Sequence, residues 1–485
     1  MKRFLAFALA LILILSLAAC AGNNNNVPDP TDRPVDTDTS KVTPEPSDPT
    51  ETPSDPTEAP IDDIDDPVFP TDDPNEALPV VISGNGTCFI SYPDGTLYGW
   101  GHNEYGQVGN HSAENVALPV HIADGLVPVI VGETVFALSD KGTLWGWGRN
   151  DSGQLGLGDT ENRNSPEEIM YLVKRVYKGG TDHYFALTEG GQVYRWGGGE
   201  TNPTLYCENV REFDYWRILT NDGKLMIQHS DTWDVVAENV VAFWGDFFED
   251  AEGRLYRLWS RDPLLVAESF KEIFVTNGAG IFVLGENGEL YMYNHESQRI
   301  ELVMEGVREF FVETFSNAGW EYDVKFALKE NGELWSWGWT SNAALGKDAR
   351  TDGSTPELVA DHIRKFVTNG AMTYAITFAG EVLATGMNAG ADFIHGSLGD
   401  GGSETRFGFV RIEGLKDIRA IYCDLVEETV YHGDGTTSAA VYTRTFAVDA
   451  NGNIFAWGYN GDGLLGVNSG EETVLAPMRV NVTKD

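Results

Sequence analysis

Basic residues, cysteines and long apolar runs are all scarce in this chain of 485 residues. It carries 33 lysines and arginines against 74 aspartates and glutamates, so its formal net charge is −41. An acidic surface of this kind repels phosphate backbones and anionic headgroups, which argues against nucleic-acid binding. It also keeps proteins soluble and apart, so we expect a monomer.

Catalytic and metal-binding signatures are missing as well. The nine histidines are scattered, without a pair at the i, i+4 spacing of a helical zinc site. No nucleophile elbow or phosphate-binding loop occurs. Outside the N-terminal segment the cysteines are Cys88, Cys207 and Cys423, which permit one disulfide at most and are predicted to be small buried apolar residues. We therefore expect no enzyme activity, no metal and no cofactor.

The one long apolar run follows Lys2 and Arg3 and ends in the string "LAAC", Leu17 to Cys20. It is short for a membrane-spanning helix and is typical of a secretory signal. Small residues before a cysteine resemble the lipobox of bacterial lipoproteins, in which that cysteine is lipidated and becomes the N-terminus. Residues 1–20 are thus predicted to be a lipoprotein signal that anchors the protein on the extracellular face of a bacterial cell membrane. The alternative is an ordinary signal peptide that happens to end near a cysteine.

Residues 21–79 hold 13 of the 21 prolines, and 16 acidic residues against two basic ones. This segment has too few apolar residues to offset the entropy lost on folding, so it is predicted to be a disordered, extended stalk. Its string "DDIDD" at 62–66 could attract calcium loosely, although a solvated acidic tail is the simpler interpretation. Residues 80–485 contain no second linker and are predicted to form one domain, with 58 acidic and 29 basic side chains.

One string recurs within this domain. It reads "GTLYGWGHNEYGQVG" at 95–109 and "GTLWGWGRNDSGQLG" at 142–156, and weaker copies begin at Gly332 and Gly452. A run typical of a strand precedes the first glycine, and a second strand follows it. In that second strand Thr143, Trp145 and Trp147 should face one side, while Leu144, Gly146 and Gly148 face the other and let a neighbouring sheet come close.

The strand–Gly–strand unit can be followed nine times along the chain, at intervals of 30 to 72 residues. Its turn glycines are Gly95, Gly142, Gly191, Gly223, Gly253, Gly288, Gly332, Gly380 and Gly452. Short strands at such a period predict an all-β propeller. The alternation excludes helical repeats, and a stacked β-solenoid would need a shorter and stricter period.

The segment "FALSDKGTLWGWGRNDSGQLGLGDTENRNSPEEI" resembles a repeat of the regulator of chromosome condensation family. The match is close around Gly95, Gly142, Gly332 and Gly452, and faint from about 205 to 304. The resemblance implies a closed propeller, usually of seven blades; with nine units counted, we predict seven to nine. Pairing of the C-terminal run "APMRVNV" with the initial "PVVISGNG" is expected to close the ring with one blade built from both termini.

Two long insertions occupy the same position of their units, at 313–325 and at about 424–445. They should therefore emerge on the same face of the ring, where they would place six binding candidates: Phe315, Trp320, Tyr322, Tyr431, His432 and Tyr442. Aromatic side chains with polar neighbours commonly anchor binding patches, although these could instead fold back and cap the ring. The string "HGDG" at 432–435 indicates a hairpin turn. A third expansion, 387–409, is expected nearer the opposite or outer edge.

These features favour a binding module outside the cell. The leading hypothesis is a membrane-anchored propeller that presents a loop face to a protein; the resemblance permits this, because the family includes secreted bacterial members that inhibit an enzyme through a propeller face. The alternative is a carbohydrate or cell-wall binder that uses the same aromatics. A hydrolytic enzyme is less favoured. So is guanine nucleotide exchange, the activity of the family's eukaryotic founder, because the signal sequence takes the chain out of the cytoplasm.

Overall fold

The computed structural model describes residues 78–482, with interruptions. The interruptions are 180–181, 215, 230–231, 259–262, 277–279, 295, 318–319, 340–342, 348–354, 389–397 and 432–436. The predicted signal sequence, with Cys20, and residues 21–77 of the predicted stalk lie outside the described residues. Among the described residues, no helix is long and apolar enough to span a bilayer.

The described residues form nine antiparallel sheets of four strands each, here called blades 1 to 9 in chain order. Blade 1 consists of β1 (Val80–Gly84), β2 (Thr87–Ser91), β3 (Thr96–Gly101) and β4 (Val116–Asp124). Blade 2 consists of β5 (Leu126–Ile130), β6 (Thr134–Ser139), β7 (Leu144–Gly148) and β8 (Arg163–Met170). Blade 3 consists of β9 (Val173–Gly179), β10 (His183–Thr188), β11 (Val193–Gly197) and β12 (Glu200–Cys207). Blade 4 consists of β13 (Val210–Phe213), β14 (Arg217–Thr220), β15 (Leu225–His229) and β16 (Thr232–Ala237). Blade 5 consists of β17 (Val240–Trp244), β18 (Phe247–Asp250), β19 (Leu255–Arg257) and β20 (Leu264–Ala267). Blade 6 consists of β21 (Glu272–Val275), β22 (Ile281–Leu284), β23 (Leu290–Asn294) and β24 (Arg299–Met304). Blade 7 consists of β25 (Val307–Asn317), β26 (Trp320–Lys329), β27 (Leu334–Trp339) and β28 (Glu357–Ala360). Blade 8 consists of β29 (Ile363–Thr368), β30 (Met372–Thr377), β31 (Val382–Gly386) and β32 (Arg406–Arg411). Blade 9 consists of β33 (Ile418–Tyr431), β34 (Thr437–Asp449), β35 (Ile454–Tyr459) and β36 (Thr473–Arg479), with a short 3-10 helix, η1 (Gly461–Gly463), before β36.

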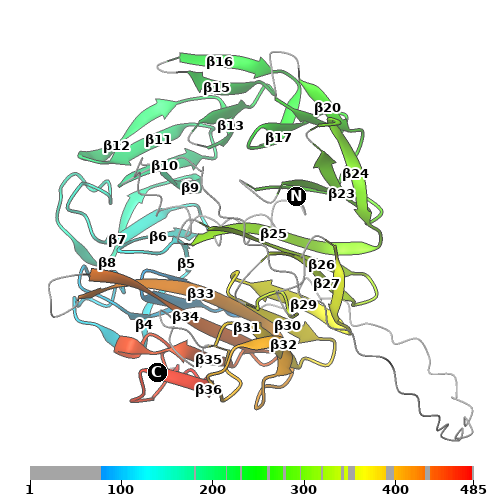
Figure 1. The fold of residues 1–485 in the computed structure, drawn as a ribbon. Helices are drawn as coiled ribbons and strands as arrows, with labels where there is room; N and C mark the ends of the chain where they lie inside the picture. Colours follow the sequence, from blue (N-terminus) through cyan, green and yellow to red (C-terminus); the bar gives the residue numbers. More distant parts are fainter. Residues whose placement is uncertain are drawn as a thin grey trace, which may run out of the picture. The chain divides into compact units, whose positions relative to one another are not determined.

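The blades follow one another in chain order around a ring (Figure 1). Buried apolar clusters join each blade to the next. Blade 9 packs against blade 1 in the same way, with the rings of Phe446 and Trp100 6.0 Å apart. The fold is therefore a closed nine-bladed β-propeller, which confirms the predicted fold class and gives each of the nine counted units its own blade.

The predicted mode of ring closure is wrong. Blade 1 is complete within residues 80–124 and blade 9 within 418–479, so no sheet combines strands from both ends of the domain. The initial run contributes β1 to its own sheet, and the C-terminal run forms β36, which pairs with β35. Side-chain packing and polar contacts between blades 9 and 1 close the ring in place of a shared sheet.

All nine predicted turn glycines lie between the second and third strands of their blades, with φ between 72° and 89°. A residue with a side chain is strained in this left-handed region. Glycine therefore occupies the position even in blades 4 to 6, the divergent blades, where the tryptophan string is lost. The alternation predicted for the third strand also holds, since Trp145 and Trp147 both pack toward blade 1. The space beside Gly146, however, is filled by Phe136, Leu155 and Ile169 of its own blade and not by a neighbouring sheet.

The antiparallel order gives the ring two distinct rims. One rim carries the nine turn glycines and the connections from each blade to the next, and we call it the glycine rim. The other, which we call the hairpin rim, carries the connections between first and second strands and between third and fourth strands. Both long insertions lie between first and second strands, so they share the hairpin rim as predicted.

Candidate functional site

A buried asparagine organises the loop between the third and fourth strands in three blades of the ring. In blade 2 the Asn150 Oδ1 accepts a hydrogen bond from the Leu155 N–H at 2.8 Å, and its Nδ2 donates to the carbonyls of Asp159 and Glu161. Asn103 makes the equivalent bonds in blade 1, and Asn460 does so in blade 9. These side chains replace the backbone pairing that an irregular loop lacks, so the loops are held rigidly.

Each organised loop also seats the tryptophan of the following blade. The indole Nε1 of Trp147 in blade 2 donates to the Gln107 carbonyl of blade 1 at 2.8 Å, and Trp196 of blade 3 donates to the Gln154 carbonyl of blade 2 at 2.7 Å. Trp100 of blade 1 donates to the Leu464 carbonyl of blade 9 at 3.0 Å. We call this contact the indole latch. It explains the repeated string, because the tryptophan of one copy complements the loop of the preceding copy.

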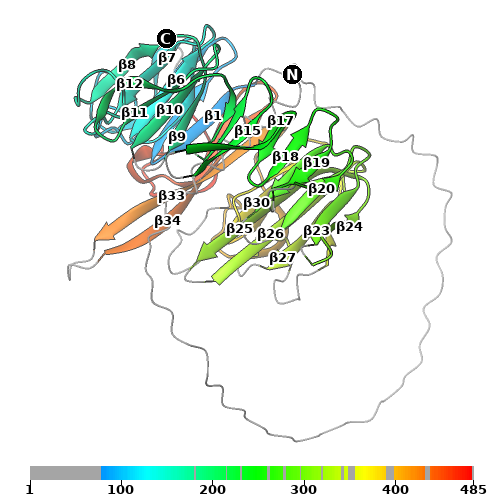
Figure 2. The ribbon, with the colours of Figure 1, turned by 90° about the horizontal axis from the view of Figure 1, so that it is seen from above.

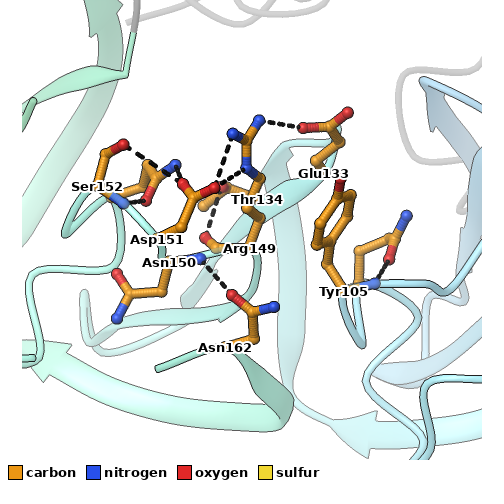
Figure 3. A network of polar contacts seen from close by, with 10 residues as sticks. Tyr105, Glu133, Thr134, Arg149, Asn150, Asp151, Ser152 and Asn162 are labelled. Carbon is orange, nitrogen blue, oxygen red and sulfur yellow. Dashed lines mark hydrogen bonds and ion pairs between the residues drawn. The ribbon is translucent and has the colours of Figure 1, made fainter. Parts of the chain in front are cut away.

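An ion-pair network lies on the hairpin rim where blades 1 and 2 meet (Figure 3). The Arg149 guanidinium binds Glu133 at 2.7 Å and Asp151 at 2.8 Å, and it lies over the ring of Tyr105 from blade 1. The hydrogen bond from Arg149 lowers the pKa of the Asp151 carboxyl, and these carboxylates raise the pKa of Arg149. The network fixes the loop that follows β7 and leaves its charges partly exposed.

The first insertion continues β25 and β26 of blade 7 into a long hairpin. Its register pairs Phe315 with Tyr322 and Asn317 with Trp320. Neighbours two residues apart and partners directly across a ribbon share one face, so this register predicts one common face for the three aromatic residues. The side chains of these three residues lie outside the described residues, so their role as binding residues stays a prediction.

The second insertion continues β33 and β34 of blade 9 into a longer hairpin, which projects beyond the neighbouring strands (Figure 2). Tyr431 pairs with Thr437 in its register, whereas His432 and the rest of the predicted turn lie outside the described residues. Tyr442 is half-buried and stacks on Tyr459 with ring centroids 4.0 Å apart. Tyr442 therefore braces the base of the hairpin.

A buried charge fixes the base of this second hairpin to blade 1. Arg444 is fully buried, and its guanidinium contacts the Asp424 carboxylate of the adjacent strand at 2.5 Å and the Cys88 Sγ of blade 1 at 3.0 Å. Ser83 of blade 1 donates to the same carboxylate at 2.6 Å. We call this group the closure clasp. It joins the last blade to the first and sets the direction in which the hairpin leaves the ring.

The third expansion corrects a prediction. It joins β31 to β32, the third and fourth strands of blade 8, and its described ends at 387–388 and 398–405 leave from the hairpin rim. The expected outer position is right, because β32 is the outermost strand, but the opposite face is wrong. Consecutive blades 7, 8 and 9 thus all carry their insertions on one rim.

Burial changes the titration of two groups beside the first hairpin. The pKa of Glu313 is raised to about 7 and that of Lys325 is lowered to about 8, in both cases because burial disfavours the charged form. Burial also raises the pKa of the thiols of Cys88, Cys207 and Cys423, which are free. Cys88 and Cys423 are buried as predicted, whereas Cys207 is half-buried.

Two features of the hairpin rim were missed from the sequence. One is a depression of about 460 Å³ on blade 9, lined by Tyr459, Asp462, Glu471 and Glu472 among others. The other is Trp216, whose side chain is 58% exposed between β13 and β14. In the part of the chain that the structure describes, no group of three or more His, Cys, Asp or Glu side chains is placed to hold a metal ion.

Comparisons with known proteins agree with the repeat pattern. Residues 94–130 and 141–187 match the model of the regulator of chromosome condensation (RCC1) repeat. The chain is 24% identical to the ultraviolet-B receptor UVR8 of Arabidopsis thaliana over 64% of this chain and 70% of that one, and 25% identical to the mitochondrial RCC1 domain-containing protein RUG3 of the same plant over 61% and 67%. Among solved structures, Prp20p from Saccharomyces cerevisiae is 14% identical over 80% of this chain and 86% of that one, with a TM-score of 0.39. Two segments of the nine-bladed propeller, in its first three blades, are therefore similar to this repeat.

Proposed function

We propose that this protein is a lipid-anchored propeller on the extracellular face of a bacterial cell membrane, and that its hairpin rim binds a protein. The observation that carries the proposal is the clustering of all three insertions on one rim of blades 7, 8 and 9. The remaining first-to-second-strand connections of the ring are short. Insertions that serve only to connect strands would have no reason to gather in neighbouring blades on a single rim.

The construction of the rim suits recognition of a folded surface. Loops that bind partners are held by a rigid scaffold, and here the closure clasp and the stacking of Tyr442 on Tyr459 fix the base of the second hairpin. The hairpins carry the aromatic candidates Phe315, Trp320 and Tyr431 on strands. Aromatic side chains supply large contact area with few rotatable bonds, which is why they dominate binding energy in protein interfaces.

Two sequence features support the proposed lipid anchor: the string "LAAC" and the acidic, proline-rich segment 21–79. Diacylation at Cys20 would hold the protein stably, because two acyl chains give firm anchoring where one gives marginal binding. Changing Cys20→Ala should release the protein into the medium or leave the precursor unprocessed, as seen by membrane fractionation. Full processing and membrane retention of the variant would contradict the anchor.

The binding role is tested by pull-down from cell-surface extract with full-length protein. A double variant, Trp320→Ala with Tyr431→Ala, should lose a specific protein band while its thermal unfolding is unchanged. The matched control is Tyr171→Ala, which removes an aromatic side chain that is 63% exposed in a connection of the glycine rim. Capture that survives the double variant would exclude the hairpins as the site. Sedimentation with peptidoglycan that depends on the same two residues would favour the carbohydrate alternative.

A further inference from the structure

An exposed tryptophan lies on the hairpin rim in the divergent blades, away from the three insertions. Trp216 belongs to the connection between β13 and β14 of blade 4. The Asp214 Oδ1 accepts hydrogen bonds from the N–H groups of Trp216 and Arg217, both at 2.8 Å, and its Oδ2 binds the Arg217 guanidinium at 3.1 Å. These contacts hold the backbone N–H groups of Trp216 and Arg217 in place, and Trp216 is 58% exposed, so less conformational entropy is lost when a ligand binds there.

 

A carboxylate of the next blade lies beside this turn. The same Arg217 guanidinium reaches Asp246 of blade 5 at 3.0 Å, and the Asp246 side chain is 60% exposed. The Asp246 carbonyl accepts a hydrogen bond from the Leu258 N–H at 2.7 Å, which fixes the turn that carries the carboxylate. Arg217 thus connects the turn that carries Trp216 with the turn of the next blade that carries Asp246.

An apolar side chain of blade 6 continues this surface. Val275 is 43% exposed at the end of β21, and a Cβ added to Gly245 would lie 3.9 Å from the Val275 Cγ1. Gly245 precedes Asp246 in the blade 5 turn, so the three blades present an aromatic, an acidic and an apolar group along one arc of the hairpin rim. We call Trp216, Asp246 and Val275 the arc surface. The hairpin of blade 7 begins at the next position of the ring.

We propose that the arc surface binds an extended, cationic segment of a protein, in which a lysine or arginine adjoins an apolar residue. The cation would stack on the Trp216 ring and pair with the Asp246 carboxylate, and the apolar residue would pack on Val275. The excess of 58 acidic over 29 basic residues in 80–485 attracts such a segment, and its charge complements the site. This inference rests on the proposed protein-binding role of the hairpin rim and names the chemistry of the segment that is bound.

The test uses full-length protein and fluorescence anisotropy of a labelled short peptide of alternating lysine and leucine. Wild-type protein should bind this peptide more tightly than a peptide of alternating glutamate and leucine. Trp216→Ala should weaken binding at least about tenfold, which is the loss typical of an interface hot spot. Asp246→Asn should weaken it about threefold and flatten its dependence on salt. The control Tyr171→Ala should bind as wild type does.

Binding of the cationic peptide by Trp216→Ala within about twofold of wild type would overturn the proposal, since ordinary attraction to an acidic protein would then explain it. An equal loss in Tyr171→Ala would overturn it as well. Binding of peptidoglycan oligosaccharides that requires Trp216, without binding of the peptide, would replace the protein segment by a glycan. Capture of a partner could also be lost in Trp216→Ala but kept in the double hairpin variant. That result would support the arc surface and exclude the hairpins as the binding site.

Discussion

Blades 1 to 3 and blades 4 to 6 share one four-stranded plan, but they are joined by different chemistry. In the first group, indole latches connect a tryptophan of each blade to a carbonyl of the blade before it. In the second group, the third strands lack the Trp-Gly pair, and apolar clusters join the blades with surface ion pairs such as Arg217 to Asp246. The architecture thus depends on buried apolar faces, and the latches add specificity to particular interfaces.

The largest difference in stability should appear between two ion-pair variants, one in the buried closure clasp and one in the exposed pair that joins blades 4 and 5. Arg444→Ala removes a fully buried guanidinium and leaves the Asp424 carboxylate without its cation, so the free energy of unfolding should fall by about 3–5 kcal/mol. Arg217→Ala breaks a partly exposed pair in the divergent blades and should cost about 1 kcal/mol. Urea denaturation measures both, and equal losses would show that the closure clasp does not stabilise the ring.

The bases of the two long hairpins offer a second contrast. Asp424 faces Arg444, whereas burial raises the pKa of Glu313 from 4.5 to about 7. Because the folded state then favours the protonated acid, Glu313 should lower stability increasingly as the pH rises from 4.5 through 7, by up to about 3 kcal/mol. Glu313→Gln should therefore stabilise the protein at pH 8 and have a much smaller effect at pH 5, as measured by denaturation at both values. A stabilisation that does not change with pH would contradict the assignment.

The indole latch can be tested within one strand. Trp147→Phe keeps a buried ring but removes the donor to the Gln107 carbonyl, so it should cost about 2 kcal/mol. Trp145 is half-buried on the same strand, and its Nε1 makes no hydrogen bond within the described residues. Trp145→Phe should therefore change stability by less than about 0.5 kcal/mol. Equal costs in thermal unfolding would mean that the lost ring volume, and not the hydrogen bond, explains the effect.

The smallest expected difference concerns two turn glycines with similar φ. A Cβ at Gly142 would lie 3.0 Å from the Val173 carbonyl oxygen, whereas the nearest atom to one at Gly253 is a flexible Glu249 oxygen at 3.9 Å. Gly253→Ala should cost about 1 kcal/mol from the left-handed backbone alone. Gly142→Ala should cost roughly 1 kcal/mol more, because its neighbour is backbone and cannot move away freely. Equal losses on denaturation would place the whole effect in the backbone conformation.

The same comparison explains what the sequence could predict. Turn glycines such as Gly223 and Gly253 persist where the tryptophan string is lost, because every blade needs a positive φ there, and they identified all nine blades. The prediction of ring closure was wrong because the sequence of a terminal strand does not show which strand it pairs with. That pairing is decided by tertiary packing. Trp216 was missed because its exposure depends on the Asp214 turn. An aspartate two residues before a tryptophan was the available signal, since it favours such a turn.

The central functional claim is that the hairpin rim binds a protein. Hydrogen exchange of the full-length protein, measured with and without its captured partner, tests this most directly. The account predicts slower exchange at backbone amides of β25, β26, β33 and β34, together with the turn around Trp216. Protection confined to the glycine-rim turns, with these strands unchanged, would contradict it.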